Sequence, residues 1–264
     1  MSKFQSLYNW YCQSQHTLPT ILHEVEYVRE EMEPPPVDLE IEAWPGRQAP
    51  SLLFFTAAFG PSRPPRTPVG VIPGADYLCF TDRDFKNPVW NTALTGPIHT
   101  DPRVSNRIVK FSDIGKLDYD YIIYVDSNVL LTGEPLDALF SALGSRALGL
   151  FEHSRGLTWK TDMLECLRLK KIHPAQLETL KQPLSILSSL NSSKQYAEGG
   201  VLIRRRGEHA AGILEFWGDL FLRYPVRDQF LFPIVFERHR ESITLFGRGL
   251  GTVRDNPVGM VLRK

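Results

Sequence analysis

The chain has 264 residues, enough for one large α/β domain or two small ones, and 42% of them are hydrophobic, which permits a substantial core. Lys and Arg number 30, as do Asp and Glu, so the formal net charge is zero. This balance argues against nucleic acid or a strongly anionic membrane surface as a partner. Three widely spaced cysteines show neither a disulfide framework nor zinc-ligand spacing, which favours a reducing compartment.

The first 48 residues predict an N-terminal helical arm. Apolar residues recur at helical spacing over 17–32, where Thr17 can cap the helix and Pro34 to Pro36 end it. No apolar run is long enough to cross a bilayer, and the first residues lack the apolar stretch of a signal peptide. We therefore expect a cytoplasmic protein without a transmembrane segment.

Residues 49–264 predict a single α/β domain in which strands alternate with helices. Helices are expected over 158–190, with interruptions at Pro174 and Pro183, and over 208–224, while 230–236 suits either type. The alternation predicts a mixed or mostly parallel sheet flanked by helices. Strands are expected at 51–60, 77–82, 107–111, 119–131, 147–151 and 199–203.

The most informative segment is the apolar run 119–131, interrupted by Asp126, Ser127 and Asn128. It predicts a buried parallel strand with Asp126 and Asn128 at its carboxyl end, where open α/β sheets bind ligands. Side chains two apart on a strand share a face, so both oxygens can face one hard cation. An ordinary polar turn explains the same pattern about equally well.

Other polar residues lie at the ends of predicted elements. Asp82 ends a strand and can accept hydrogen bonds from a nucleotide, or serve as a turn aspartate. Arg107 and Lys110 can clamp a diphosphate, or form a solvated basic face. His153 and Arg155 suit hydroxyl or carboxylate recognition, or belong to a polar loop.

Two later clusters have the same ambiguity. Glu198 precedes Gly199 and Gly200, and it can act as a base or stand in an ordinary turn. Arg227, Asp228 and Gln229 can bind sugar hydroxyls, or Asp228 can cap the following helix. Walker A, Gly-x-Gly-x-x-Gly and Gly-x-Ser-x-Gly motifs are missing from the sequence, which removes the commonest nucleotidase, dehydrogenase and hydrolase interpretations.

Taken together, these segments resemble GT-A glycosyltransferases. The resemblance rests on Phe80-Thr81-Asp82, Arg107, Lys110 and the Asp-Ser-Asn step at 126–128. Later segments resemble the family that includes the plant mucilage-related glycosyltransferases. These segments are Phe151-x-His153-x-Arg155, Glu165, Glu198-x-x-Val201-x-Ile203-Arg204, Trp217 and Arg227-Asp228-Gln229-x-x-Phe232. Glu198 to Val201 and Asp228-Gln229 are also similar to motifs of glycogenin-like retaining enzymes.

The resemblance implies a GT-A-like fold, a UDP- or GDP-linked sugar donor, Mn²⁺ or Mg²⁺, and a glycan or other hydroxyl acceptor. The donor side would comprise Thr56, Ala57, Asp82, Arg107, Lys110, Asp126, Ser127 and Asn128. His153, Arg155, Gly199, Gly200 and Arg227 would bind the substrate, while Glu198, Asp228 and Gln229 would be catalytic. The metal would be held by Asp126 and Asn128, with His239 as the nearest histidine to the position where glycogenin-like enzymes supply a further ligand.

One departure from the family pattern keeps two rival functions open. The step is Asp-Ser-Asn and not Asp-x-Asp, so it offers one carboxylate fewer to a metal. A non-catalytic protein that binds a glycan or a nucleotide sugar would tolerate this loss. A nucleotidyltransferase is the second rival, although Ala57 to Gly60 is a poor match for the basic, glycine-rich loop that such an enzyme needs after its first strand.

Overall fold

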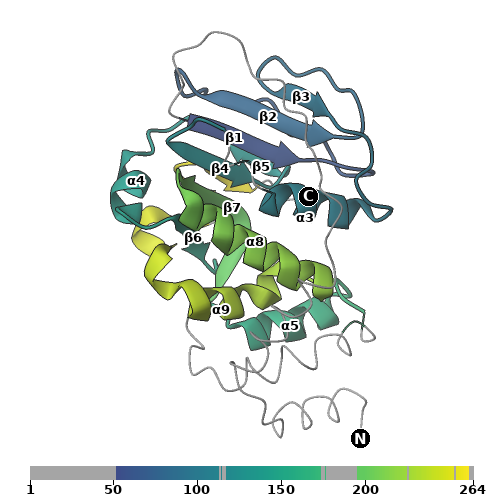
Figure 1. Cartoon of the computed structure of the whole chain (residues 1–264), viewed down its shortest axis with the longest axis vertical. Coiled ribbons are helices and arrows are strands. Elements are labelled where there is room, and N and C mark those ends of the chain that lie inside the picture. Colours follow the sequence, from purple (N-terminus) through teal and green to yellow (C-terminus); the bar gives the residue numbers. More distant parts are fainter. Residues whose placement is uncertain are drawn as a thin grey trace, which may run out of the picture.

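The computed structural model describes residues 52–112, 114, 117–173, 176, 195–224, 226–252 and 254–261 (Figure 1). The expected N-terminal arm, 1–48, and almost all of the expected helix beyond residue 173 lie outside these ranges. The described part is built around a seven-stranded sheet in the order β3-β2-β1-β4-β7-β6-β8. Its strands are β1 (Leu52–Ala57), β2 (Asp76–Thr81), β3 (Asn91–Leu94), β4 (Tyr121–Val125), β6 (Leu148–Glu152), β7 (Ala197–Arg205) and β8 (Ile243–Phe246).

The sheet is mixed and mostly parallel, as the sequence predicts. β1 runs parallel to both β2 and β4, β2 runs parallel to β3, and β6 runs parallel to β8. β7 is antiparallel to both of its neighbours, β4 and β6. One edge of the sheet therefore collects the carboxyl ends of β1, β2, β4 and β6 together with the start of β7.

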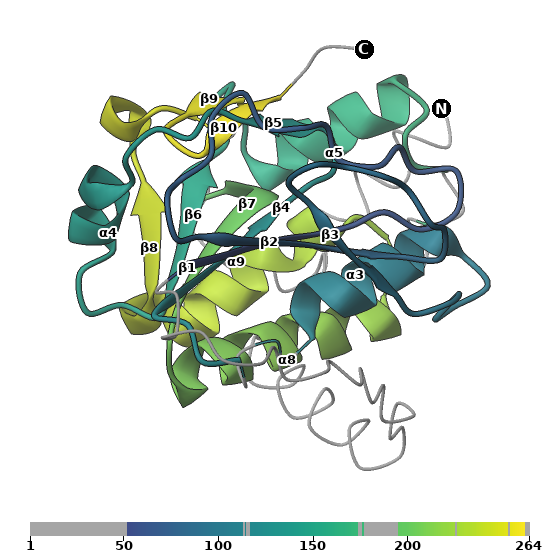
Figure 2. The same ribbon diagram turned by 90° about the horizontal axis from the view of Figure 1, so that it is seen from above.

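Helices and a small second sheet cover the two faces of the large sheet (Figure 2). On one face lie α3 (Pro102–Phe111), α8 (Glu208–Arg223) and α9 (Asp228–His239), and α5 (Trp159–Arg168) packs against α9. The other face carries α4 (Asp137–Leu143) and a three-stranded sheet. That sheet consists of β5 (Val129–Leu131), β10 (Gly259–Val261) and β9 (Asp255–Asn256), and two short 3-10 turns, η2 (Arg240–Ser242) and η3 (Arg248–Leu250), flank β8.

The central strands are buried on both faces, which explains their continuous apolar runs. In β1, Leu53 and Phe55 point into the core beneath α3 and α8, whereas Leu52 and Phe54 point into the core beneath α4. All four side chains are at most 6% exposed. A strand that is covered on both faces has no polar side, so its sequence is an unbroken hydrophobic stretch and does not alternate between apolar and polar residues.

The segment 107–111 is helical, so the prediction of a strand there was wrong. Asp101 caps α3 by accepting a hydrogen bond from the Arg103 N–H at 2.9 Å, and Pro102 occupies the first helical position. These start signals lie before the five-residue apolar pattern on which the strand prediction was based. Of the two options left open for 230–236, the structure selects the helix, α9.

Two further differences concern the lengths and number of elements. α5 ends at Arg168, because Lys170 takes a left-handed conformation with φ 54° and turns the chain. The sequence did not predict β3, β8, β9, β10 or α4, nor β5 as a strand separate from β4. In the described ranges no helix combines the length and the apolar character that crossing a bilayer would need.

Candidate active site

The candidate active site lies at the edge of the sheet where β1, β2, β4 and β6 end and β7 begins. The pairing of β4 with β7 continues past Val125, since the Asp126 N–H donates to the Gly200 carbonyl at 2.8 Å. On the other side of β7, Glu198 stands opposite Phe151, near the end of β6. Residues that are far apart in sequence, such as Asp126, Gly200 and His153, are therefore brought to one edge.

Asp126 occupies the first position after β4. Its carboxylate accepts a hydrogen bond from the Tyr124 hydroxyl at 2.8 Å and lies 3.8 Å from the Arg107 guanidinium. The chain then turns, because the Val129 N–H bonds back to the Asp126 carbonyl at 2.9 Å. Asn128 is exposed within this turn, so the strand geometry that predicted a shared face for Asp126 and Asn128 does not extend beyond Val125.

Arg107 and Lys110, from one face of α3, both bind Asp228 at the start of α9. The Arg107 Nε lies 2.9 Å from Asp228 Oδ1, and the Lys110 Nζ lies 2.5 Å from Asp228 Oδ2. Arg107 thus links the carboxylates of Asp228 and Asp126. The three-residue spacing of Arg107 and Lys110, predicted on a strand, becomes one face of a helix pointing at a single carboxylate.

The Lys110–Asp228 pair of this ion cluster is almost inaccessible to water, whereas the Arg107 side chain is 28% exposed. The side chains of Lys110 and Asp228 are 1% and 6% exposed, and the ammonium lies 5.2 to 5.5 Å from the ring centroids of Phe111, Tyr124 and Trp217. Burial alone would raise the pKa of Asp228, but Arg107 and Lys110 outweigh it and hold this pKa well below its usual range. Burial lowers the pKa of Lys110, and Asp228 opposes this effect. The carboxylate is therefore ionised at neutral pH.

Gly199 makes room for this cluster. A Cβ atom added at Gly199 would lie 2.6 Å from the Lys110 Nζ and 3.5 Å from Asp228 Oδ2. The glycine that the sequence analysis assigned to substrate binding therefore lies directly against the buried ammonium. Gly200 contributes the carbonyl that binds the Asp126 N–H.

We expect Gly199→Ala to destabilise the protein by about 1–3 kcal/mol, because the new methyl group overpacks the Lys110–Asp228 pair. The matched control is Gly212→Ala in α8, where an added Cβ would meet nothing within 4 Å. The control should gain roughly 0.5–1 kcal/mol from helix propensity. Chemical denaturation of both variants measures the difference, and equal stabilities would contradict the close packing at Gly199.

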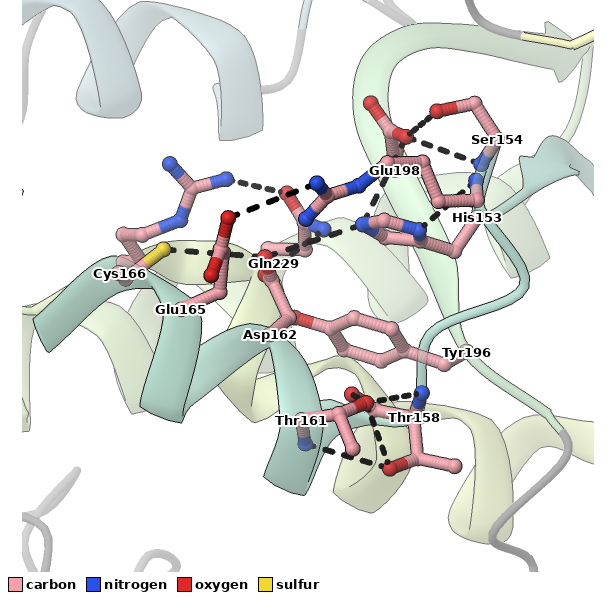
Figure 3. Close-up of polar contacts among 12 residues, drawn as sticks. His153, Ser154, Thr158, Thr161, Asp162, Glu165, Cys166, Tyr196, Glu198 and Gln229 are labelled. Atoms are coloured by element: carbon pink, nitrogen blue, oxygen red, sulfur yellow. Dashed lines mark hydrogen bonds and ion pairs between the residues drawn. The ribbon is translucent and has the colours of Figure 1, made fainter. Parts of the chain in front are cut away.

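Beside this cluster lies a cavity of about 350 Å³, lined by His153, Arg155, Asp162, Glu165, Cys166, Leu169, Lys171, Glu198, Arg227 and Arg254. The His153 ring stacks on Tyr196 at 5.5 Å between centroids (Figure 3). Its Nδ1 accepts from the Arg155 N–H at 3.3 Å, which assigns the proton to Nε2. Nε2 lies 3.6 Å from Glu198 Oε1 and 3.8 Å from Asp162 Oδ1.

Glu198 is held firmly at the wall of the cavity. Its Oε1 accepts hydrogen bonds from the Ser154 N–H at 3.0 Å and from the Ser154 hydroxyl at 2.5 Å. Arg254, from the C-terminal segment, donates to Ser154 Oγ at 2.8 Å and lies 3.8 Å from Glu198 Oε2. Glu198 is thus the one member of the predicted catalytic set that lines the cavity.

Asp162 is a site residue that the sequence analysis did not single out. Its Oδ2 accepts from the Tyr196 hydroxyl at 2.9 Å and from the Gln229 amide at 3.4 Å. Burial raises the pKa of Asp162, but His153, Arg227 and Tyr196 together lower it below its ordinary value. A signal was present, because Asp162, Glu165 and Cys166 are spaced three and four apart and form one face of α5 (Figure 3).

Asp228 and Gln229 lie behind the cavity wall. They are 4% and 6% exposed, and neither lines the cavity. Gln229 accepts a hydrogen bond from Arg227 at 2.7 Å and donates to Asp162. Their contacts place Arg107, Lys110, Arg227 and Asp162, so both residues influence the site through other side chains. Arg227, and not Asp228, is the N-cap residue of α9.

A second cavity, of about 420 Å³, lies at the ends of β1 and β2 and is lined by Phe59, Asp82, Pro97, Ile98, His99, Thr100, Pro102 and Ser105. Both oxygens of Asp82 accept from the Gly60 N–H, at 3.1 and 3.0 Å. Asp82 therefore acts as a turn aspartate and also lines a cavity. Thr56 and Ala57, expected on the donor side, are buried within β1 and line neither of the two cavities.

The structure separates His239 from the other expected metal ligands. His239 is the last residue of α9, eleven residues after Asp228, a helical rise of about 16 Å. Its ring packs against Phe216, and burial lowers its pKa. A ligand set of Asp126, Asn128 and His239 is therefore not formed, because the metal-binding role was assigned from chain position and not from the path of α9.

The expected cation ligands are one carboxylate, Asp126, and one amide, Asn128. Tyr124 and Arg107 engage Asp126 Oδ1, and Asn128 is exposed. Within the described ranges no three His, Cys, Asp or Glu side chains cluster as a metal site would require. One carboxylate and one amide fit Mg²⁺ or Mn²⁺ when substrate phosphates supply further oxygens.

No protein-family model and no curated protein sequence matches the chain. Among solved structures, a bifunctional glycosyltransferase, WbbM, is similar at 11% identity and a TM-score of 0.42 over 77% of this chain and 40% of its own. The glycosyltransferase GlyE of Streptococcus pneumoniae is similar at 13% identity and a TM-score of 0.43, over 75% of this chain and 45% of its own. Mouse xyloside xylosyltransferase 1 is similar at 10% identity and a TM-score of 0.39, over 74% of this chain and 84% of its own.

The chain thus spans less than half the length of the first two of these proteins. All three are glycosyltransferases.

Proposed function

We propose that the chain is a glycosyltransferase that moves a sugar from a nucleotide-sugar donor to a hydroxyl group of an acceptor. The observation that carries this proposal is the row of polar side chains along one edge of the sheet. It runs from Asp126 through Arg107 and Asp228 to the cavity that contains His153 and Glu198. A row of this kind can hold a charged leaving group beside a pocket for a sugar.

The donor would lie across the ends of β1, β2 and β4. The 420 Å³ cavity beside Phe59 and Asp82 offers apolar and polar walls for a nucleoside. Ser105 lines this cavity, and Arg107 is on the same helix, so the diphosphate would follow α3 toward Asp126. Its developing negative charge would be stabilised by the Arg107 guanidinium, which Asp228 holds in place.

The transferred sugar and the acceptor would occupy the 350 Å³ cavity. In this cavity the Glu198 carboxylate and the His153 Nε2 lie 3.6 Å apart, and both line the wall. A carboxylate there can stabilise an oxocarbenium-like sugar or accept a proton from the acceptor hydroxyl. Ser154 fixes the orientation of Glu198 through two hydrogen bonds. The retaining outcome suggested by the resemblance to glycogenin-like enzymes stays a prediction.

A divalent cation would be held by Asp126 and Asn128, and when bound it would neutralise the leaving diphosphate. The donor set of one carboxylate and one amide makes this cation easy to exchange. The cytoplasmic location, the single GT-A-like domain over 49–264 behind a helical arm, and the closer resemblance to the plant mucilage-related family belong to the proposal as well.

We expect a nucleoside diphosphate to raise the melting temperature, and Mn²⁺ to increase the shift, because a ligand of the native state stabilises it by about 2.7 kcal/mol at one hundred times its Kd. The measurement is a thermal-shift titration with UDP, GDP, ADP and CDP, with and without Mn²⁺. The variant Asn128→Asp adds a second carboxylate and should enlarge the part of the shift that depends on Mn²⁺. If none of the four nucleotides shifts the melting temperature, the donor site is not where we place it.

Turnover separates an enzyme from a non-catalytic binding protein. Release of nucleoside diphosphate from a panel of nucleotide sugars, with water or simple sugars as acceptor, reports transfer directly. Binding without any release would favour the non-catalytic rival.

A further inference from the structure

The 350 Å³ cavity carries more positive than negative charge. Its lining includes four permanent cations, Arg155, Lys171, Arg227 and Arg254, but only three carboxylates, Asp162, Glu165 and Glu198. A neutral sugar needs hydrogen-bonding groups of either kind but no surplus of cations. Any lining cation that has no partner within the protein is therefore available to an anionic ligand.

The three carboxylates already have their own donors. Asp162 is bound by the Tyr196 hydroxyl and the Gln229 amide, and Glu198 is bound by Ser154. Glu165 accepts two hydrogen bonds of 2.8 Å from Arg168, which does not line the cavity. Arg168 and Arg155 lower the pKa of Glu165 to about 2, so this carboxylate stays ionised and occupied.

Lys171 and Arg227 lack such a partner. Within the described ranges, no carboxylate oxygen lies within 4 Å of either cation, and the Arg227 Nε is buried without a hydrogen-bond partner. Arg227 uses one N–H on the Gln229 amide, at 2.7 Å. The Nε is too buried to meet a ligand, so an anion in the cavity would be bound by the terminal N–H groups of Arg227, which lines it.

Both cations line the same cavity, Lys171 with an exposed side chain and Arg227 with a half-buried one. The left-handed turn at Lys170 folds the chain back, so the Lys171 N–H bonds to the Cys166 carbonyl at 2.8 Å. An arginine and a lysine that line one cavity can bind a carboxylate or a phosphate, the arginine as a fork and the lysine as a point charge.

We infer that this cavity binds an anionic saccharide, one whose carboxylate or phosphate group is held between Lys171 and Arg227. The inference deepens the proposed function, because it assigns a class of substrate to the acceptor side of the site. The anionic group would lie near Cys166, while a hydroxyl of the same saccharide would face Glu198 and His153 at the other wall of the cavity.

The test is a binding titration of the full chain with three probes: glucuronate, glucose 6-phosphate and glucose, followed by ligand-observed NMR. We expect at least one of the two anions to bind tenfold more tightly than glucose. Lys171→Gln and Arg227→Gln should each weaken the preferred anion about tenfold and weaken glucose much less, since each removes one charge-assisted contact. Lys170→Gln makes the same charge change one residue away, outside the lining, and should have no effect.

The outcomes separate the possible sources of the anion. Stronger binding of glucuronate identifies an acidic sugar, and stronger binding of glucose 6-phosphate identifies a phosphorylated one. Equal binding of all three probes, or unchanged binding in both variants, overturns the inference. If UDP displaces the anion from the wild type, and both variants weaken UDP itself, the two cations belong to the donor diphosphate and the inference is wrong as well. These results do not depend on turnover, so they stand apart from the test of transferase activity.

Discussion

Asp228→Asn is expected to lower the free energy of unfolding by about 3–5 kcal/mol, because it removes the partner of two cations in a buried site. Lys110 is 1% exposed, and its ammonium lies beside three aromatic rings. In the variant this ammonium would lose the carboxylate that lies 2.5 Å away in the wild type. Such a loss is a large fraction of the 5–15 kcal/mol that typically stabilises a domain. Urea denaturation monitored by tryptophan fluorescence measures it.

The control is the double variant Lys110→Met/Asp228→Asn. Methionine removes the orphaned ammonium and keeps an unbranched side chain among the rings, so the double variant should be more stable than Asp228→Asn alone. If the single variant does not fold, recovery of folding in the double variant still tests the pair. A double variant that is no better than the single one would show that Lys110 is not the source of the cost.

The Lys110–Asp228 pair should also make the free energy of unfolding depend on pH, with stability falling as pH falls. The folded-state pKa of Asp228 is lowered, so its stabilising contribution is complete above the unfolded-state value of about 3.9 and is lost as pH falls toward the folded value. Between pH 5 and pH 3 the wild type should therefore lose more stability than Asp228→Asn. Other acidic groups contribute to both proteins and cancel in the comparison.

The central strands could be predicted from the sequence, because a strand that is buried on both faces is a continuous apolar run. Leu52 to Ala57 and Tyr121 to Val125 are apolar runs of strand length, and both prove to be central strands. The edge strand β3 was missed for the same reason. β3 (Asn91–Leu94) has no fully buried residue, so its sequence carries no such run.

Only part of the site could be predicted. The sequence indicates where strands and helices end, but it does not show how they pack against one another. Asp126, His153 and Glu198 were found since each lies at the end of a strand. Asp162 and Lys171 were missed, because their positions depend on how α5 packs against α9 and on the left-handed turn at Lys170. Arg107 was found as a residue, yet its helix and its two carboxylate partners follow from the cap at Asp101 and from tertiary packing.

Asp126→Asn should reduce sugar transfer at least 100-fold while changing the free energy of unfolding by less than about 1 kcal/mol. Its side chain is 36% exposed, in contrast to 6% for Asp228, so loss of its charge leaves no group stranded in the interior. Arg107 keeps its 2.9 Å contact with Asp228 in the variant. The expected loss comes from weaker binding of the donor diphosphate and its cation.

Tyr124→Phe is the matched control for this prediction. It removes the 2.8 Å hydrogen bond to Asp126 Oδ1 but keeps both the carboxylate charge and the aromatic packing against Phe55. It should therefore retain most of the activity and lose about 1 kcal/mol of stability. Release of nucleoside diphosphate from the donor gives the activity, and urea denaturation gives the stability. If Asp126→Asn instead unfolds well below wild type and keeps its specific activity, Asp126 is a structural residue that orients Tyr124 and Arg107, and the donor phosphate must bind elsewhere along α3.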